Sequence, residues 1–269
     1  MEDVITYYNQ YDEASRITTD NARKLEFITT IHTLDASLPA DAEILDLGAG
    51  TGVYSFYYAE KGHAVVSTDI TPKHVEIIQS RIEASGLANI SAEIADATDL
   101  SRYESASFDA VFCLGPMYHL KAAVDQNKCI SECMRVLKPG GILAVAYVNK
   151  LFLLPHLVRG NPAFMNEAWV TRILDEGMIH ASDEDCFWTD ACFHTPEEME
   201  ALMDEFQEVV KMTHVATDGV GVLMHDTINA LDEEKYKAWV NYHLRTCAEP
   251  SILGISNHGM VLYRKNSGL

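Results

Sequence analysis

Three alternate glycines lie within the segment Gly48–Gly52, directly after an apolar run that contains one acid, Asp46. Ile44–Leu47 reads as a buried strand and a helical pattern begins at Thr51, so the glycines fall at a strand-to-helix turn. Glycine lets the backbone take a positive φ and lets a ligand approach closely, because it has no Cβ. Asp46 is placed to accept hydrogen bonds from an ammonium group or from N–H groups of the turn. The segment therefore predicts a site for an adenosyl cofactor.

The spacing of these glycines separates two classes of ligand. A dinucleotide-binding turn has the form Gly-x-Gly-x-x-Gly and meets a pyrophosphate with a helix N-terminus. Here the pattern is Gly-x-Gly-x-Gly, and the carboxylate of Asp46 would repel a pyrophosphate but would suit the cationic amino-acid end of S-adenosylmethionine. The segment resembles motif I of the class I S-adenosylmethionine-dependent methyltransferases. A glycine turn alone also occurs as a tight turn with no ligand, so at this point both interpretations stand.

Two further acids come at the ends of predicted strands. His63–Asp69 reads as a second strand, and Asp69 follows the last glycine by 17 residues. An acid at the tip of the second strand of an α/β sheet can accept hydrogen bonds from both hydroxyls of a ribose. Asn89–Ala95 reads as a third strand, and Asp96 in the following loop is placed to accept a hydrogen bond from an adenine amino group.

Helices between these strands complete an alternating pattern. Val53–Lys61 and Pro72–Ser85 read as helices that each stop at a glycine. Ser107–Leu114 reads as a fourth strand, and Lys138–Gly141 breaks a helix ahead of the fifth strand, Ile142–Val148. Five strands with helices between them predict an α/β fold with a doubly wound parallel sheet. Ligands of such sheets bind beyond the carboxyl ends of the strands, where the chain places Gly48, Asp69, Asp96 and Cys113.

The resemblance to the class I methyltransferases covers residues 40–150 in four ordered parts: the acid with the glycines, Asp69, the Asp96-Ala97 loop and the Arg135–Gly141 turn. It implies a seven-stranded, mostly parallel sheet of order 3-2-1-4-5-7-6 with an antiparallel seventh strand. The sixth strand is expected near Glu208–Val215 and the seventh near Gly259–Arg264. The implied methyl donor is S-adenosyl-L-methionine, and S-adenosylhomocysteine is the implied product. The residues expected to bind this cofactor are Tyr11, Arg16, Asp46, Gly48, Ala49, Gly50, Asp69, Ile70, Asp96, Ala97, Cys113, Leu114 and Gly115.

The turn Gly115–Leu120 follows the fourth strand, at the position that faces the transferring methyl group in this family. Its sequence, Gly-Pro-Met-Tyr-His-Leu, resembles the Gly-Pro-x-Tyr-His-Leu variant of a bacterial subgroup and not the Asn-Pro-Pro-Tyr motif of enzymes that methylate amino groups of nucleic acids. Tyr118 and His119 are therefore the candidate catalytic residues, because a neutral histidine can take a proton from an acceptor. The alternative is structural: Tyr118 packs under a lid, and His119 hydrogen-bonds a backbone carbonyl.

One domain over residues 1–269 is favoured, with three segments outside the common core: 1–38, 149–195 and 218–257. We expect these segments to form a substrate lid over the strand ends, mainly helical. In the first, Tyr7–Arg16 is rich in aromatic residues, and the resemblance places such a segment across the cofactor. Tyr11 would then cover the methyl group and Arg16 would pair with the cofactor carboxylate. The alternative is an amphipathic helix whose tyrosines pack on the core.

Composition excludes several classes of partner. The chain has 40 acids against 20 Lys and Arg, a formal net charge of −20, and no basic run that would follow a nucleic-acid backbone. No apolar run approaches the ~20 residues that span a bilayer. Six cysteines at irregular spacing favour a reduced, cytoplasmic protein. We expect a monomer or a homodimer. Cys129 and Cys133 are interpreted as core residues, and no metal site is expected, because His225, His243 and His258 match no metal-binding spacing.

These observations predict methyl transfer from S-adenosylmethionine to a small-molecule acceptor. The alternatives are a protein acceptor, which would suit the acidic surface, and a cofactor-binding protein without catalysis. A nicotinamide-dependent oxidoreductase is disfavoured by Asp46 and by the glycine spacing. The fold is common to enzymes with many different acceptors, so neither the acceptor nor the methylated element follows from the sequence.

Overall fold

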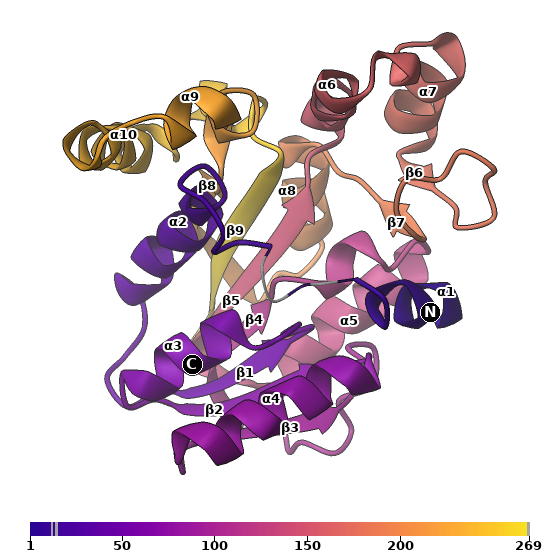
Figure 1. Ribbon diagram of the computed structural model, residues 1–269. Helices are drawn as coiled ribbons and strands as arrows, with labels where there is room; N and C mark the ends of the chain where they lie inside the picture. The colour runs from indigo at the N-terminus through magenta and orange to yellow at the C-terminus, as the bar shows by residue number, and fades with distance from the viewer. Residues whose placement is uncertain (12, 14–15, 268–269) are drawn as a thin grey trace.

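The computed structural model describes residues 1–11, 13 and 16–267, so Asp12, Ala14 and Ser15 of the predicted N-terminal segment lie outside the described residues. A seven-stranded sheet of order β3-β2-β1-β4-β5-β9-β8 forms its centre (Figure 1). Strands β1 to β5 pair in parallel, and β9 is antiparallel to both of its neighbours. The strands are β1 Glu43–Leu47, β2 Ala64–Asp69, β3 Ile90–Ile94, β4 Phe108–Cys113, β5 Leu137–Val148, β8 Val209–Ala216 and β9 His258–Lys265.

This order is the predicted one, because β8 and β9 are the sixth and seventh strands of the sheet along the chain. Both lie within one or two residues of their predicted positions. The predicted strand Ile142–Val148 is too short, since β5 begins at Leu137, which pairs with Phe108. Lys138–Gly141 therefore lies inside the strand. Gly140 has a φ of +78°, and a Cβ on Gly141 would lie 2.9 Å from the carbonyl oxygen of Asp109. The register between β4 and β5 shifts between Phe108 and Ala110, and the glycines let the two strands pair closely across this shift.

Helices cover the two faces of the sheet. Leu34, Tyr58 and Ile78 pack with Ile44 and Phe112 in one apolar cluster. Residues of α5 and α8 pack with the opposite faces of β1, β4 and β5 in a second cluster. The helices nearest the sheet are α2 Lys24–Asp35, α3 Val53–Glu60, α4 Pro72–Ser85, α5 Ala123–Val136 and α8 Pro196–Asp204. Local signals set their ends: Gly86 closes α4 in the left-handed conformation, and Thr195 with Glu198 forms the capping box of α8.

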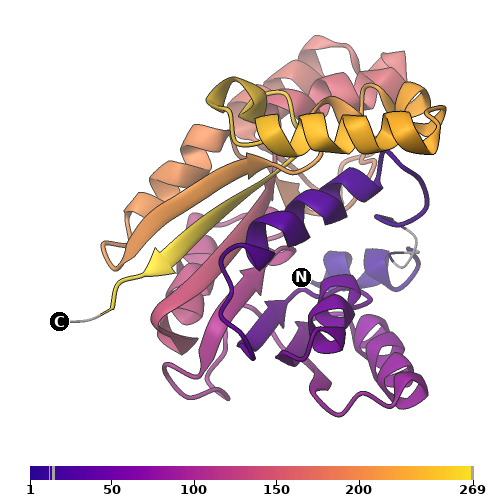
Figure 2. The ribbon, with the colours of Figure 1, turned by 90° about the vertical axis from the view of Figure 1, so that its left-hand side faces the viewer.

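Most of the remaining elements lie at the top of Figure 1, whereas α1 lies at the right of that view, beside the N-terminus. Apart from η2, they come from the three segments expected to form a lid. In Figure 2, α10 lies across the top of α2. These elements are α1 Glu2–Tyr8, α6 Lys150–Gly160, η3 Pro162–Phe164, α7 Glu167–Thr171, η4 Arg172–Glu176, β6 Met178–Ile179, β7 Ala191–Cys192, η5 Gly219–Gly221, α9 His225–Asn229, α10 Glu233–Thr246 and α11 Pro250–Leu253, with the single turn η2 Pro116–Tyr118 after β4. Among the described residues, no helix combines the length and apolar character needed to cross a membrane.

Candidate active site

The glycine turn between β1 and α3 has the predicted backbone. Gly48 and Gly50 have φ values of +67° and +55°. A Cβ on Gly48 would lie 3.0 Å from Cδ of Pro116, and one on Gly50 would lie 3.1 Å from Cγ of Glu13. These positions therefore need glycine both for their backbone conformation and for the close approach of neighbouring segments.

Asp69, at the end of β2, fixes this turn through its carboxylate. One oxygen accepts a hydrogen bond from the N–H of Gly50 at 2.9 Å, and the other accepts from the N–H of Thr71 at 2.8 Å. The Nδ1 atom of His74 lies 3.3 Å from the first oxygen. A carboxylate oxygen can accept more than one hydrogen bond, so Asp69 keeps the capacity to bind a ribose diol while it holds the turn.

A first cavity opens between the glycine turn, the ends of β2 and β3, and η2. Asp96 is ordered there, because one of its oxygens accepts from the N–H and the hydroxyl of Thr98 at 2.8 and 2.9 Å. This cavity brings together the part of the predicted set that should hold the adenosine: Gly48, Gly50, Asp69, Ile70, Asp96, Ala97 and Gly115.

A second cavity lies on the other side of the glycine turn and contains Asp46, Ala49, Leu114 and Arg16 of the predicted set. Asp46 is 1% exposed, and Ser55 donates a hydrogen bond of 2.5 Å to it. Burial, and after it the charge of Asp69, raise the pKa of Asp46 to about 7. The Oγ1 atom of Thr51, which also lines this cavity, is buried with no partner among the described residues. A buried carboxylate and an unpaired hydroxyl fit the ammonium and carboxylate groups of an amino acid.

Arg16 already has two carboxylate partners. It contacts Glu26 through both terminal nitrogens, at 2.8 and 3.0 Å, and its Nε contacts Glu13 at 2.7 Å. The predicted ion pair with the cofactor carboxylate would add a third acid around the guanidinium. That role of Arg16 stays a prediction. Glu13 and Glu26, its neighbours in the structure, were not among the predicted site residues.

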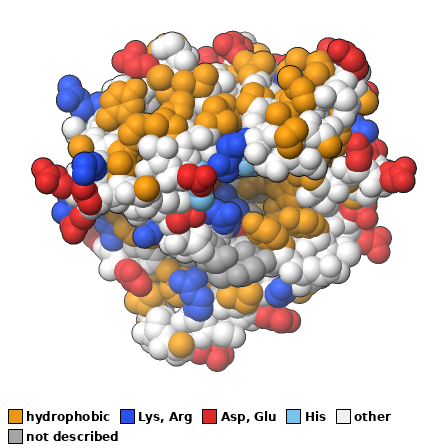
Figure 3. Space-filling model, turned by 45° about the horizontal axis from the view of Figure 1, so that its top comes forward, with side chains coloured by type: hydrophobic (Ala, Val, Ile, Leu, Met, Phe, Trp, Pro, Cys, Tyr) orange, Lys and Arg blue, Asp and Glu red, His pale blue; other side chains and the backbone are white. Residues whose placement is uncertain are grey.

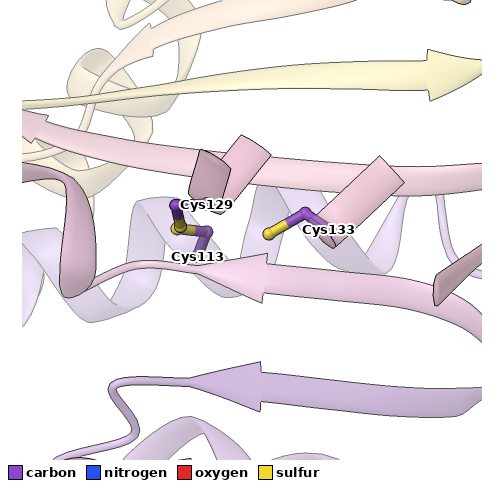
Figure 4. Close-up of side chains that lie close together, drawn as sticks. All are labelled: Cys113, Cys129 and Cys133. Atoms are coloured by element: carbon purple, nitrogen blue, oxygen red, sulfur yellow. The ribbon is translucent and has the colours of Figure 1, made fainter. Parts of the chain in front are cut away.

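Cys113 lies at the end of β4, but its side chain points away from both cavities toward α5 (Figure 4). Its Sγ lies 3.8 Å from that of Cys129, and the sulfurs of Cys113, Cys129 and Cys133 lie within 4.8 Å of one another. All three are fully buried within an apolar cluster. Any contact of Cys113 with the cofactor would therefore come from its backbone. The sequence analysis paired only Cys129 and Cys133; Cys113 joins them because α5 packs against the end of β4.

Tyr118 occupies the most central position of the site. Together with Glu13, it lines the first cavity, the second cavity and a third, larger one. Its hydroxyl donates a hydrogen bond of 3.2 Å to the carbonyl of Leu114. Tyr118 therefore lies where the two expected cofactor cavities meet the third cavity, and its role beside the transferring methyl group stays a prediction.

His119 has partners at both ring nitrogens. Nδ1 lies 2.9 Å from the backbone carbonyl of Asp190, and Nε2 lies 3.0 Å from the hydroxyl of Tyr8. The carbonyl can only accept, so Nδ1 carries a proton, and in a neutral ring Nε2 accepts from the tyrosine hydroxyl. Burial lowers the pKa of His119 to about 4. The contact with the carbonyl is the one that the structural alternative expected, and His119 does not line the third cavity.

The third cavity has a volume of about 420 Å³ and takes most of its walls from the three predicted lid segments, with Tyr118, Val148 and His258 from outside them. Aromatic side chains from the first two segments form part of it, and charged side chains from all three lie between them. Figure 3 shows a hollow on this face with hydrophobic, basic and histidine side chains along its edge. The predicted residue Tyr11 lines this cavity and neither of the other two. Residues that sequence reasoning did not assign to a site include Glu13, Glu26, His156, Asp218, Asn257 and His258.

Comparison with known proteins agrees with this geometry. A family described as "Methyltransferase domain" matches residues 39–243. The ubiquinone biosynthesis O-methyltransferase of Xanthomonas axonopodis pv. citri is 30% identical over 145 residues, 54% of this chain and 57% of that protein. Methyltransferase GfsG of Streptomyces halstedii is 34% identical over 115 residues, 42% of this chain and 39% of that protein. The chain thus matches about half the length, or less, of these curated relatives.

Solved structures extend the likeness of the fold over nearly the whole chain. A protein of Pyrococcus horikoshii has a TM-score of 0.62 at 16% identity, covering 97% of this chain and 99% of its own. The geranyl diphosphate C-methyltransferase of Streptomyces coelicolor, solved with S-adenosyl-L-homocysteine, has a TM-score of 0.60 at 15% identity, covering 98% and 97%. The sheet order, the two cavities and the family match lead to one conclusion. The chain belongs to the methyltransferase domain family and is a class I S-adenosylmethionine-dependent methyltransferase domain, with S-adenosylmethionine as methyl donor and S-adenosylhomocysteine as product.

Proposed function

We propose that this protein transfers the methyl group of S-adenosylmethionine to a small-molecule acceptor bound in the third cavity. The observation that carries the proposal is the junction of the cavities: Tyr118 and Glu13 line all three. A volume of about 420 Å³ is in the range of small-molecule sites, and aromatic walls are typical of them. The O-methyltransferase and C-methyltransferase among the similar proteins support an acceptor of this size.

Different residues would bind different parts of the cofactor. Asp69 and Asp96 would hold the ribose and the adenine in the first cavity, and Asp46 with Thr51 would hold the amino-acid end in the second. The bound sulfonium supplies an activated methyl group. Alignment of the acceptor with that group and exclusion of water remain for the protein, because in-line displacement needs no covalent intermediate on the chain. Tyr118 and the aromatic wall serve both purposes.

Calorimetry with S-adenosylhomocysteine tests the cofactor part of the proposal. We expect one site per chain, and no detectable binding would contradict the assignment of the first two cavities. Asp125→Ala is a suitable control for the binding variants described below, because Asp125 is exposed at the start of α5 and lies outside these cavities.

Transfer of a labelled methyl group tests the acceptor part. The protein is incubated with methyl-labelled S-adenosylmethionine and a cell extract, and the products are separated by ultrafiltration. Label in the low-mass fraction supports a small-molecule acceptor. Label that stays only with macromolecules supports protein methylation, and tight cofactor binding with no labelled product supports a binding protein without catalysis.

A further inference from the structure

His258, the first residue of β9, stands where the second and third cavities meet, since it lines both. Its Nδ1 atom lies 2.8 Å from Oδ2 of Asp218, a buried residue between β8 and η5. The two residues are 40 positions apart in the chain, and the pairing of β8 with β9 brings them together. The sequence reading treated this histidine as structural, and the proposed binding of cofactor and acceptor leaves it without a role.

Asp218 is held in place by the chain on either side of His258. Its other oxygen, Oδ1, accepts from the hydroxyl of Ser256 at 2.6 Å and from the N–H groups of Asn257 and His258 at 2.9 and 3.1 Å. These hydrogen bonds leave Oδ2 to accept from Nδ1 of the imidazole. A carboxylate in this position selects the tautomer with the proton on Nδ1, so Nε2 is an acceptor.

The Nε2 atom has no strong partner among the described residues. Its one contact there is Nδ2 of Asn257 at 3.4 Å, a long distance for a hydrogen bond. The amide oxygen of Asn257, which also lines the third cavity, is buried without a partner in the described part of the chain. Two hydrogen-bond acceptors therefore stand together beside the cavity, and a hydroxyl group is a donor that would suit them.

We propose that His258 is the general base of the methyl transfer, that Asp218 is its positioning residue, and that the acceptor is a hydroxyl compound. This proposal rests on the proposed function and deepens it. The acceptor oxygen forms a bond to the methyl carbon while the bond from that carbon to sulfur breaks and its electron pair stays on sulfur. The hydroxyl proton goes to Nε2 of His258 and later to solvent. The products are a methyl ether and S-adenosylhomocysteine, whose sulfur is neutral.

The chemistry of the acceptor is the reason for this assignment. A neutral hydroxyl is a weak nucleophile, and a positioned base is worth about 10²- to 10⁴-fold in rate. A neutral amine has a free lone pair and needs no base before it attacks. A histidine oriented by a buried carboxylate at the junction of the two cavities is therefore a feature that a hydroxyl acceptor requires. His119 cannot serve this purpose in the observed arrangement, since both of its nitrogens are engaged.

Charged groups on several elements face His258. Asp218 precedes η5, Glu26 of α2 lies 3.6 Å from Nδ1, and Arg16 and His156 lie farther away. Burial alone would lower the pKa of His258, but Glu26 and Asp218 outweigh it and raise the pKa above the ordinary value of 6.5. The base must be neutral to accept a proton. Activity should therefore rise with pH through a value above 6.5 and then reach a plateau.

The test uses matched hydroxyl and amine probes with methyl-labelled S-adenosylmethionine: catechol against 1,2-diaminobenzene, and 4-methylphenol against 4-methylaniline, all at millimolar concentration. His258→Asn keeps a donor toward Asp218 but removes Nε2. We expect label only in the hydroxyl probes and a fall in kcat of about 100-fold in the variant, with an unchanged Kd for S-adenosylhomocysteine. His32→Asn, an exposed histidine of α2, is the control and should keep the wild-type rate.

Asp218→Asn tests the positioning residue. An asparagine can still accept at Oδ1 from the turn, but its amide would favour the opposite tautomer of His258 and would no longer raise the pKa of the imidazole. We expect kcat to fall about 10- to 100-fold and the inflection of its pH profile to move to lower pH. A purely structural role would lower stability without moving that inflection.

Three results would overturn the dyad: His258→Asn within threefold of wild type, label in the amine probes alone, or no label in any hydroxyl probe. Methylated amines would leave the proposed small-molecule function intact. Label confined to macromolecules in the extract experiment would contradict that function itself, so the two failures can be told apart.

Discussion

In the cofactor half, residues 40–150, nearly every predicted site residue lies within a few positions of a glycine turn or a strand end. The third cavity instead collects side chains from α1 and α2, from α6 and the Phe187-Trp188 segment, and from the start of β9. The first arrangement depends on backbone geometry that a short motif encodes. The third cavity depends on contacts between segments that lie far apart in the chain, from Tyr7 to His258. The residues expected to bind the donor are thus close together in the sequence, and those that line the proposed acceptor cavity are not.

Substitution of Asp69 should have the largest effect on cofactor affinity, and it tests whether a local motif encodes the donor site. Asp69→Ala removes the carboxylate that fixes Gly50 and Thr71 and that would bind the ribose. We expect S-adenosylhomocysteine to bind about 10- to 150-fold more weakly, which corresponds to about 1.5–3 kcal/mol for hydrogen bonds to a charged group. Calorimetry measures the change, and Asp125→Ala should bind as the wild type does. An unchanged affinity in Asp69→Ala would contradict the assignment of the ribose to this carboxylate.

A smaller effect concerns the protonation of Asp46. Its pKa is raised to about 7, so the carboxyl group is mostly neutral at pH 6 and must lose a proton to meet a cofactor ammonium. Affinity for S-adenosylhomocysteine should therefore increase about fivefold between pH 6 and pH 7, following the ionised fraction. Asp46→Asn should bind more weakly and lose most of this pH dependence. The same slope in the variant as in the wild type would assign the titration to another group.

For Tyr11, the sequence prediction and the structure point to different cavities. The sequence assigned it to the cofactor, whereas the structure places it in the third cavity, stacked on Tyr7 with ring centres 5.4 Å apart. We expect Tyr11→Ala to change the Kd for S-adenosylhomocysteine by less than about twofold and to weaken acceptor binding by about 1 kcal/mol, the contribution of one aromatic contact. A cofactor Kd weakened tenfold would restore the original assignment.

The smallest functional effect is expected at the cysteine group under α5. Contact with Cys113, and burial to a lesser extent, raise the pKa of the Cys129 thiol. Three buried thiols in an apolar cluster should therefore be inert to Ellman's reagent in the folded protein and should bind no stoichiometric zinc. Cys129→Ala should cost about 1 kcal/mol of unfolding free energy and leave cofactor binding unchanged. One zinc per chain by metal analysis would contradict this interpretation.

Local patterns predicted most strand positions, and the resemblance to the class I methyltransferases implied the sheet order that the structure confirms. Alternating strands and helices, Gly86 at the end of α4 and the capping box at Thr195 are examples. The prediction was wrong where a local signal has two meanings. Lys138–Gly141 reads as a break but lies within β5, since Leu137 finds a partner in Phe108 that no local signal reveals. The catalytic role of His119 stays a prediction; its contacts with Tyr8 and Asp190 come from distant segments that no local signal reveals.

By itself, then, the sequence determined the methyl donor and the scaffold, because motifs at a strand-to-helix turn and at strand ends carry their own geometry. Only the tertiary structure decided which residues line the third cavity, the proposed acceptor site. Asp218 and His258 become a pair only when β8 lies beside β9, and Glu26 and Arg16 join them only when α2 and the N-terminal segment pack over the sheet. Residues so far apart in the sequence form no recognisable motif, because only the packing of the folded chain brings them together.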